Sequence, residues 1–299
     1  MPASAREPTE GLLVVDKPGG LTSHDVVAQV RRDRQTRRVG HGGTLDPMAT
    51  GVLVLAVGRA TRLLGYVGGM DKEYQATIRL GASTTTDDAE GQPTGGAPAT
   101  GLDEGRIRSM MAGLTGPIDQ VPSSVSAVKV NGRRAYERVR AGQSVSLAPR
   151  RVLVSSFTVV DVRHPAQARG MVDLDVTTTV SSGTYVRALA RDLGAGLGVG
   201  GHLTSLRRTR VGTFTVADAV DLGSAGVPTA LLPMPDAARR VLPSLLLDAD
   251  EASRLRHGVR LTGTGYAPTG TVAAYAPDGS LVAIAEVHPD GVRPLAVLG

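Results

Sequence analysis

The scarcity of aromatic side chains limits how this chain can build its interior. The 299 residues include six Tyr, two Phe and no Trp, so Val, Leu, Ala and Ile must form the core. The composition, 41% hydrophobic and 20% charged, is that of a globular protein, and a chain of this length buries roughly 75% of its unfolded surface. Wholesale disorder is therefore excluded, and each of the few tyrosines is a candidate for a specific role.

Cysteine is absent from the chain. This excludes disulfides, thiolate nucleophiles and zinc sites built on Cys, and it favours a reducing, cytoplasmic location. The first ten residues lack the apolar region of a signal peptide, and no apolar run approaches the roughly 20 residues that span a bilayer. We therefore expect neither secretion nor insertion into a membrane.

The balance of charges modestly favours a polyanionic partner. Thirty-three basic and 28 acidic side chains give a net charge of +5 and a pI near 9.9, a balance common among nucleic-acid-binding proteins. Only three of the basic residues are Lys and thirty are Arg. Two explanations fit this preference for Arg equally: GC-rich codon usage and selection for bidentate phosphate contacts.

Hydrophobic periodicity predicts a chain of alternating strands and helices. Short apolar runs or period-two alternation predict strands over residues 11–16, 52–57, 72–80, 124–130, 152–162, 171–180 and 202–214. Capping residues and apolar stripes predict helices over about residues 23–31, 103–111, 135–141 and 185–193. Strands in mixed order with interspersed helices are typical of an α+β fold with a mixed sheet.

Two changes in composition mark the expected domain organisation. Regular patterning stops in the Pro- and Ala-rich stretch 223–243 and then resumes as short strands. We therefore expect a larger domain over residues 1–235 and a small β-rich module over residues 244–299. Residues 82–101 are rich in Thr, Gly, Pro and Asp without periodicity, which predicts a long flexible insertion in the larger domain.

The loop from Gly40 to Pro47 is the first candidate site, because it places one imidazole and one carboxylate in flexible backbone between two apolar strands. A purely structural interpretation remains open for both groups. Asp46 would cap a short helix that has Pro47 at its first position. His41 would be an ordinary hydrogen-bonding residue rather than a general base.

Tyr74, Tyr185 and Arg187 have equally plain interpretations when each is taken alone. Tyr74 shares a strand with apolar Ala76 and Ile78, which fits core packing. Tyr185 fits a core residue near the start of a helix, and Arg187 fits a solvated surface cation there.

An acidic cluster at Asp87, Asp88 and Glu90 raises the question of a cation site. The cluster lacks the alternating oxygen-ligand spacing of an EF-hand loop. We therefore expect no metal there.

Five ordered sequence blocks make the chain recognisable as a whole. They are Val15-Asp-Lys17-Pro18-Gly-Gly-Leu-Thr-Ser23, Gly40-His41-Gly-Gly-Thr-Leu-Asp46-Pro-Met-Ala-Thr-Gly51, Asp71-Lys-Glu-Tyr74, Ser182-Gly-Thr-Tyr185-Val-Arg187 and Leu206-Arg-Arg208. Together they closely resemble the TruB family of tRNA pseudouridine synthases over about residues 11–214. The C-terminal module resembles the small PUA-like RNA-binding domain of that family. The resemblance implies the pseudouridine synthase fold, with a mixed central sheet and flanking helices.

The resemblance also implies a reaction. The family converts uridine 55 in the T-loop of tRNA to pseudouridine, exchanging an N-glycosidic for a C-glycosidic bond without a cofactor or metal. Asp46 is implied as the catalytic carboxylate and Arg187 as the arginine that pairs with it, because an opposite charge nearby keeps a carboxylate ionised and oriented. A folded T-loop hides its bases, so the target uridine must be flipped out.

Further roles follow from the matching positions. Tyr74 is implied as the residue that stacks on the uracil, and either Tyr74 or Tyr185 is placed to influence proton removal at C5. The remaining implied site residues are His41, which displaces the base, Tyr185 and Leu206, which line the uracil pocket, and Lys17 and Pro18, which support the catalytic loop. We expect phosphate contacts from the basic residues Arg31, Arg32, Arg34, Arg37, Arg38, Arg133, Arg134, Arg207 and Arg208.

Two residues depart from the family pattern: Thr85 stands where an acidic residue is common, and Gly42 where Thr or Ala is common. A catalytically silent tRNA-binding or folding protein is the rival from another class, and the pair of Asp46 and Arg187 argues against it. A nucleoside hydrolase would need a water-activating partner or a metal cluster, and neither is evident. The family resemblance implies a monomer.

Overall fold

The computed structural model describes residues 9–125, 129–130, 133–134, 147–222 and 231–298. The chain divides into two compact units. Unit 1 comprises Met1–Pro47, Val52–Gly69 and Val211–Gly299, and unit 2 comprises Met48–Gly51 and Met70–Arg210. Of the residues predicted for the site, Lys17, His41 and Asp46 belong to unit 1, and Tyr74, Tyr185, Arg187 and Leu206 belong to unit 2.

The N-terminal part of unit 1 holds the loop of Asp46 between short strands. β1 (Gly11–Lys17) pairs in parallel with β14 (Val220–Asp221) and antiparallel with β15 (Leu232–Pro233). β2 (Val39–His41) pairs antiparallel with β3 (Thr50–Val57), so the loop between them returns on itself. The remaining elements are η1 (Gly58–Leu63), α2 (Leu64–Gly69), β13 (Phe214–Thr215), η2 (Val216–Asp218) and α6 (Met234–Val241).

Helix α1 (Ser23–Asp33) begins where the sequence predicts it. Thr22 is the N-cap: its hydroxyl accepts from the main-chain N–H of Asp25, and the Asp25 carboxylate accepts from the N–H of Thr22. This capping box satisfies two N–H groups that the first turn leaves without partners. Val26, Val27 and Val30 form the buried stripe of the helix, as expected.

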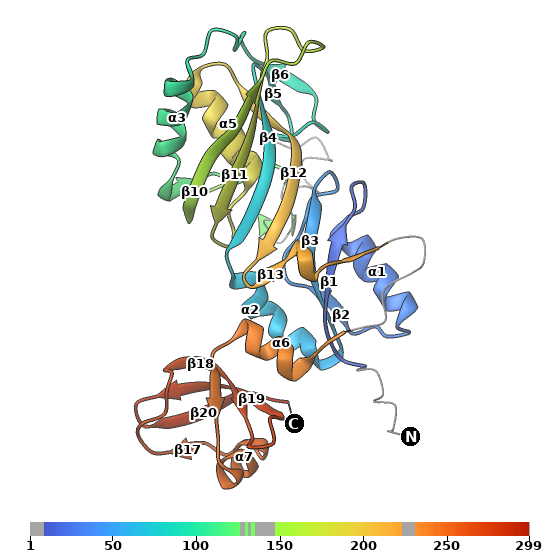
Figure 1. The fold of residues 1–299 in the computed structure, drawn as a ribbon, viewed down its shortest axis with the longest axis vertical. Helices are drawn as coiled ribbons and strands as arrows, with labels where there is room; N and C mark the ends of the chain where they lie inside the picture. The colour runs from blue at the N-terminus through green and yellow to red at the C-terminus, as the bar shows by residue number, and fades with distance from the viewer. Residues whose placement is uncertain (1–8, 126–128, 131–132, 135–146, 223–230, 299) are drawn as a thin grey trace. The chain divides into compact units, whose positions relative to one another are not determined.

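Unit 2 is built on a strongly paired antiparallel sheet (Figure 1). β4 (Lys72–Leu80) pairs with β11 (Val172–Val180), β11 with β10 (Arg150–Arg163), and β10 with β7 (Gly116–Gln120). β12 (Gly201–Val211) lies next to β4 in the strand order. Helices α3 (Glu104–Gly113) and α5 (Val186–Leu197) pack against each other and against this sheet.

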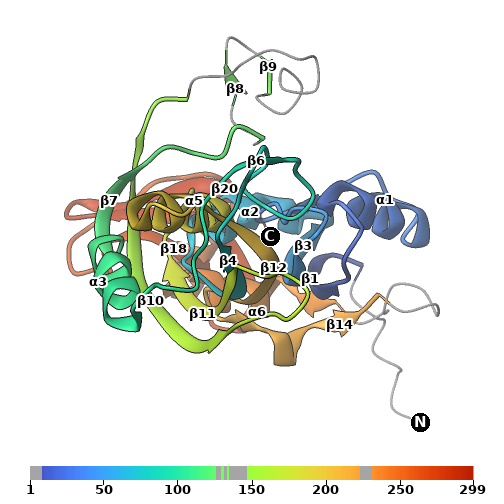
Figure 2. The same cartoon turned by 90° about the horizontal axis from the view of Figure 1, so that it is seen from above.

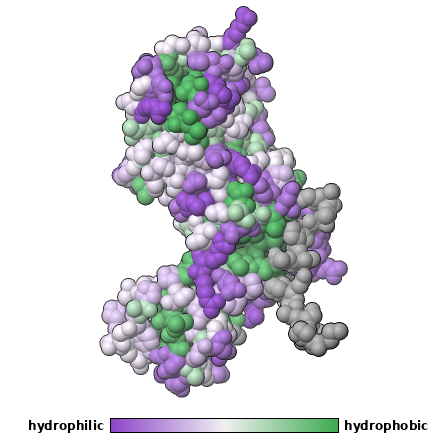
Figure 3. Space-filling model, viewed as in Figure 1, coloured by the Kyte–Doolittle hydropathy of each residue, from purple (hydrophilic) through white to green (hydrophobic). Residues whose placement is uncertain are grey.

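Alternation along β4 separates a core face from a polar face. Tyr74, Ala76, Ile78 and Leu80 are buried, as the period-two pattern predicts. On the other face polar side chains pair across strands: Thr77 donates to Asp175, Arg79 donates both Nε and a terminal nitrogen to Asp173, and the Thr158 and Thr177 hydroxyls bond to each other. In the upper part of Figure 3, which shows the surface of unit 2, a strip of hydrophobic residues lies between hydrophilic ones.

Residues 82–101, expected as a flexible insertion, contain a short hairpin and a buried carboxylate. β5 (Ser83–Thr84) and β6 (Pro93–Gly95) pair as an antiparallel hairpin. Within it Asp88 forms a β-bridge to Leu203 and is 3% exposed. Hydrogen bonds rather than apolar periodicity hold this segment, so a hydrophobic pattern could not reveal it. Its flexibility stays a prediction.

The C-terminal part of unit 1 has a sheet and a core of its own. The strand order is β16 (Ser244–Leu246), β18 (Gly270–Tyr275), β19 (Leu281–His288), β20 (Gly291–Val297) and β17 (Leu261–Thr262). Its buried residues, among them Leu255, Val272 and Val282, form one cluster. Helix α7 (Ala249–Arg256) was not expected, and its capping box between Asp248 and Glu251 is the signal that could have shown it.

The strand expected over residues 124–130 is only partly described: residues 129–130 form β8 (Lys129–Val130), paired with β9 (Arg133–Arg134), residues 124–125 form no strand, and residues 126–128 lie outside the described residues. The structure also places a strand earlier, at β7, where Pro117 hides the pattern. The β8–β9 hairpin stands away from the sheet of unit 2 (Figure 2). The helix expected over residues 135–141 lies outside the described residues. Within the described ranges, no helix is both long and apolar enough to cross a bilayer.

Candidate active site

The chain around Asp46 forms an irregular loop with a turn at residues 47–48, and no helix follows. The interpretation of Asp46 as a helix cap is therefore wrong. Its side chain is partly buried. Leu45, the preceding residue, is 3% exposed and anchors the loop in the core of unit 1.

Lys17 supports this loop from β1. Its side chain is fully buried, and its ammonium donates to the carbonyl oxygens of Pro18, Leu21 and Pro47 at 2.8, 2.7 and 3.3 Å. An ammonium has three N–H donors, which is enough for these three carbonyls. The Pro47 carbonyl also accepts from the main-chain N–H of Gly20 at 2.8 Å. The turn on the C-terminal side of Asp46 is thus tied to β1 and its following turn.

Ser23 holds the other side of Asp46, a role that the sequence did not suggest. Its hydroxyl donates to the Leu45 carbonyl at 3.1 Å and accepts from the Leu45 N–H at 2.8 Å. Ser23 is 1% exposed, so these bonds replace water that cannot reach the peptide. Buried side chains therefore hold the main chain of both residues that flank Asp46: Ser23 holds Leu45, and Lys17 holds the carbonyl of Pro47.

His41 ends β2 close to the same loop. Its Nδ1 accepts from the main-chain N–H of Gly43 at 3.4 Å, and its ring meets the His24 ring edge to face with centroids 5.4 Å apart. Gly42, a departure from the family pattern, has a packing reason here. A Cβ at this position would lie 2.5 Å from Cγ1 of Val67, so a larger residue would require Val67 to shift.

In unit 2, Tyr74 lies on β4 opposite Thr178 of β11 and is 7% exposed. Tyr185 is the N-cap residue of α5 and is partly buried. The Tyr185 side chain makes no capping hydrogen bond to the helix. Instead, the buried side-chain amide of Gln120 bonds to both the main-chain N–H and the carbonyl of Tyr185.

Arg187, in the first turn of α5, is 3% exposed, so the interpretation as a solvated surface cation is wrong. It donates to the carbonyl oxygens of Thr86 at 2.7 Å and Val125 at 2.8 Å, and its Nε lies 3.6 Å from the Asp88 carboxylate. Asp88 is therefore an ion-pair partner that the sequence did not identify. Asp46 belongs to unit 1, and its pairing with Arg187 stays a prediction.

Asp88 is itself well held within the β5–β6 hairpin. Its carboxylate accepts from the Thr86 hydroxyl and from the Glu90 N–H. Thr85, the second departure from the family pattern, closes the hairpin: its hydroxyl accepts from the main-chain N–H of Gln92 at 3.1 Å. An acidic residue is thus not needed there to order this segment.

Leu206 lies on β12 and is 7% exposed. It lines a cavity of about 680 Å³ within unit 2 together with polar residues of neighbouring strands, including Gln75, Thr77, Asp175 and Arg207. None of Tyr74, Tyr185 and Arg187 is among the described residues that line this cavity. The role of Leu206 as a wall of the uracil site stays a prediction.

The arginines expected to contact phosphate differ in exposure. Arg31, Arg32, Arg37 and Arg38 are exposed at the end of α1 and in the loop after it, and Arg34 and Arg207 are partly buried. Arg208 is 1% exposed, so we leave it out of the proposed phosphate contacts. The side chains of Arg133 and Arg134 lie outside the part of the structure that is described.

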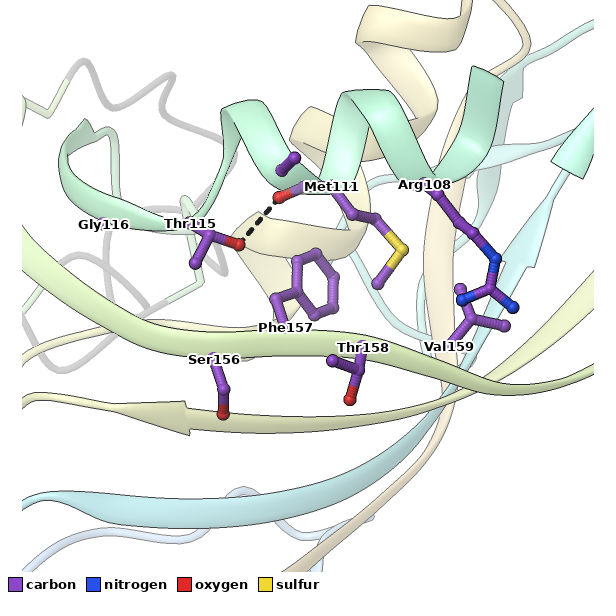
Figure 4. A pocket seen from close by; sticks show the side chains of 9 residues that line it. Arg108, Met111, Thr115, Gly116, Ser156, Phe157, Thr158 and Val159 are labelled. Carbon is purple, nitrogen blue, oxygen red and sulfur yellow. Dashed lines mark hydrogen bonds between the residues drawn. The ribbon is translucent and has the colours of Figure 1, made fainter. Parts of the chain in front are cut away.

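A second cavity of about 530 Å³ lies between α3 and β10. Figure 4 shows the Phe157 ring and the Met111 side chain pointing into this space, while Ser156 and Thr158 point away from it. The Thr115 hydroxyl donates to the Met111 carbonyl at 2.9 Å and closes the end of the helix. The cavity contains none of the predicted site residues.

In the ranges that the structure describes, no three His, Asp or Glu residues come together in a way that could hold a metal ion.

Solved structures of similar fold define the class of protein. The chain aligns over 97% of its length with a protein in the structure of an H/ACA RNP bound to a substrate RNA containing 2′-deoxyuridine, covering 86% of that chain at 25% identity and a TM-score of 0.71. A chain of a Cbf5-Nop10-Gar1 complex aligns equally well, with 27% identity, a TM-score of 0.71 and 84% of that chain covered. The fold is that of the pseudouridine synthases, and the α+β prediction is confirmed.

Sequence comparison gives the family. The model of the TruB family pseudouridylate synthase N-terminal domain matches residues 31–186, and those of the tRNA pseudouridine synthase II C-terminal region and the tRNA pseudouridylate synthase B C-terminal domain match residues 242–299 and 187–252. The chain belongs to the TruB family of pseudouridylate synthases, which are isomerases. The resemblance seen in the sequence is confirmed.

Among curated relatives, tRNA pseudouridine synthase B of Thermobifida fusca (strain YX) is 53% identical over 289 residues, which cover 96% of this chain and 98% of the relative. The protein of the same name from Arthrobacter sp. (strain FB24) is 55% identical over 294 residues, with 96% of each chain covered.

Proposed function

We propose that this protein isomerises uridine 55 in the T-loop of tRNA to pseudouridine, with Asp46 as the catalytic carboxylate. The tRNA substrate is supported by the names of relatives more than 50% identical over nearly the whole chain. The observation that carries the role of Asp46 is that buried side chains hold the main chain of its two neighbouring residues, Leu45 through Ser23 and Pro47 through Lys17. Such buried support is expected where a carboxylate must be held in one position against a reacting bond.

The isomerisation exchanges one glycosidic bond for another and moves one proton. The bond from N1 of uracil to the ribose C1′ breaks, the base turns, and a bond from C5 to C1′ replaces it. The C5 hydrogen leaves as a proton, and N1 gains a proton, so atoms and charge balance without a redox step. An ionised Asp suits the first step because it can act on the sugar or on the base next to the glycosidic bond. Glycoside hydrolases use carboxylates beside the bond that breaks in a similar way.

The aromatic residues of unit 2 have the roles that remain in this scheme. We assign Tyr74 to stacking on the flipped uracil and Tyr185 to the wall of the uracil pocket, with either placed to influence removal of the C5 proton. Flipping the base costs a few kcal/mol, and stacking on an aromatic side chain returns about 1–3 kcal/mol. Phosphate contacts supply the remainder in this proposal. Their best candidates are the exposed residues Arg31, Arg32, Arg37 and Arg38.

Three assignments complete the proposal. The protein acts as a monomer in the cytoplasm. Its catalytic domain covers about residues 1–235. Residues 244–299 serve as a PUA-like RNA-binding module.

The test is release of tritium from tRNA labelled at C5 of uridine. The wild-type protein should release the label of uridine 55, and Asp46→Asn and Asp46→Ala should release none above background. Asp161→Asn is the matched control, because that carboxylate is exposed on β10. A tRNA with cytidine at position 55 should release no label.

Two outcomes would contradict the proposal. Equal release by the wild type and both Asp46 variants would remove Asp46 from the chemistry. Tight binding of tRNA by the wild type without any release would instead support a tRNA-binding protein that has no catalytic activity.

A further inference from the structure

The buried side-chain amide of Gln120 binds the main chain of Tyr185. Gln120, the last residue of β7, is 2% exposed. Its Oε1 accepts from the Tyr185 N–H at 2.8 Å, and its Nε2 donates to the Tyr185 carbonyl at 3.1 Å. The two residues lie 65 positions apart in the sequence, so this contact is tertiary and joins the edge strand to the start of α5.

Both bonds are chemically complementary. A main-chain N–H can only donate and a carbonyl can only accept, so the oxygen of the amide must face the N–H and its nitrogen must face the carbonyl. Among side chains of this length, only Gln offers one acceptor and one donor in a single planar group. Glu would present two acceptors, and Met would present no strong partner for either group.

The contact fixes the direction in which the tyrosine side chain leaves the backbone. Tyr185 has φ −107° and ψ 110°, an extended conformation immediately before the helix. Its carbonyl also accepts the first helical bond, from the Leu189 N–H at 3.2 Å. With the N–H and carbonyl of one residue both held, its Cα–Cβ bond has a fixed direction, and only the side-chain torsions remain free.

The same stretch of chain is bound to α5 at two further points. Arg191 donates to the Val121 carbonyl at 2.7 Å, and Arg187 donates to the Val125 carbonyl at 2.8 Å. Residues 120–125 therefore follow the first two turns of α5 through main-chain contacts. Among these three contacts, the one made by Gln120 is the contact that holds a proposed site tyrosine.

We infer that Gln120 is a positioning residue of the reaction: it holds the Tyr185 main chain so that the phenol ring meets the flipped uracil in one orientation. The inference rests on the proposed function and adds a residue to it. Gln120 has no proposed contact with tRNA and acts only through Tyr185, which meets the base. A change at Gln120 should therefore lower the rate of isomerisation in the bound complex and leave tRNA affinity unchanged.

The experiment measures the single-turnover rate of tritium release with excess enzyme, together with the Kd for tRNA. Gln120→Met and Gln120→Glu are compared with Gln167→Met, in which an exposed glutamine of the turn between β10 and β11 is changed. Misplacing a reacting group by about 1 Å costs on the order of 10²-fold in rate. We therefore expect both Gln120 variants to lose tenfold or more in rate with less than a threefold change in Kd.

A double-variant cycle separates positioning from general support of the fold. When Tyr185→Ala has already removed the ring, Gln120→Met should lower the rate by less than a further twofold. A general structural role would give the same loss in both backgrounds, because it would act through groups other than Tyr185.

The outcomes distinguish this inference from the proposed function. A wild-type protein without tritium release would contradict the proposed function itself. An active wild type with Gln120→Met and Gln120→Glu at the wild-type rate would overturn the role of Gln120 alone. Losses that are equal in the wild-type and Tyr185→Ala backgrounds, or that appear in Kd rather than in rate, would also overturn it.

Discussion

Two neighbouring hydroxyls offer a sharp test of how the loop of Asp46 is supported. Thr22 and Ser23 are adjacent in the sequence, but they bind different parts of the structure. The Thr22 hydroxyl caps α1 at an exposed position, whereas the buried Ser23 hydroxyl makes both of its bonds to Leu45. Replacing each by Ala removes one hydroxyl and separates stability of the helix from placement of the catalytic loop.

The expected magnitudes follow from what each change leaves behind. Ser23→Ala removes two hydrogen bonds worth about 1 kcal/mol each and leaves a buried N–H without its partner, so the free energy of unfolding should fall by about 2–4 kcal/mol. Thr22→Ala removes an N-cap and should cost about 1 kcal/mol. Only Ser23→Ala frees the peptide before Asp46, and this should lower the rate of tritium release by tenfold or more.

Urea denaturation measures the two stabilities, and single-turnover tritium release measures the two rates, both at a temperature where each variant is folded. Thr22→Ala should retain at least half of the wild-type rate. If the two variants show equal rates, or if Ser23→Ala retains the wild-type rate despite its loss of stability, the support of Asp46 by Ser23 is refuted. Ser23→Thr, which keeps the hydroxyl, is the control for the hydrogen bonds.

The remaining predictions concern salt, pH and the C-terminal module. Raising salt from 50 to 200 mM should weaken tRNA binding steeply, and Arg32→Ala should reduce the slope of log Kd against log salt by about one contact; an unchanged slope would exclude Arg32 from phosphate binding. Burial, reinforced by Arg208, lowers the pKa of Lys72 from 10.5 to about 8. The folded state therefore loses this proton at a lower pH than the unfolded state, so the free energy of unfolding should rise by about 3 kcal/mol between pH 8 and 10.5. Lys72→Gln should abolish that rise, as measured by urea denaturation at a series of pH values. Tyr275, fully buried, donates to the Pro235 carbonyl at 2.8 Å, so Tyr275→Phe should lower the free energy of unfolding by about 1 kcal/mol and leave the rate of tritium release unchanged.

Much of the fold could be predicted from the sequence because its strands and helices carry local signals. The alternation through β4 and the capping residues before α1 each specify their element within a few neighbouring residues. Helices α6 and α7 have eight residues each and lie where the composition suggested a linker or strands. A helix of two turns carries too few apolar positions to establish a period.

For the candidate site, the sequence predicts chemical groups but not their supports. Sequence motifs predict Asp46, Tyr185 and Arg187 as site residues, and they do not indicate the residues that hold them. Ser23 and Gln120 bind main-chain atoms, which every residue has, so no complementary residue type marks their partners. Such contacts depend on how distant segments pack, and a linear pattern does not contain that information.

The main-chain nature of the Gln120 contact makes position 185 suitable for chemical substitution. Because the Gln120 amide bonds to the N–H and carbonyl of that residue, which every tyrosine analogue keeps, fluorinated tyrosines with graded phenol acidity can be installed there with both hydrogen bonds retained. A plot of log rate against phenol acidity would then report how far the hydroxyl takes part in moving the C5 proton. A slope of zero would assign this residue to shape alone.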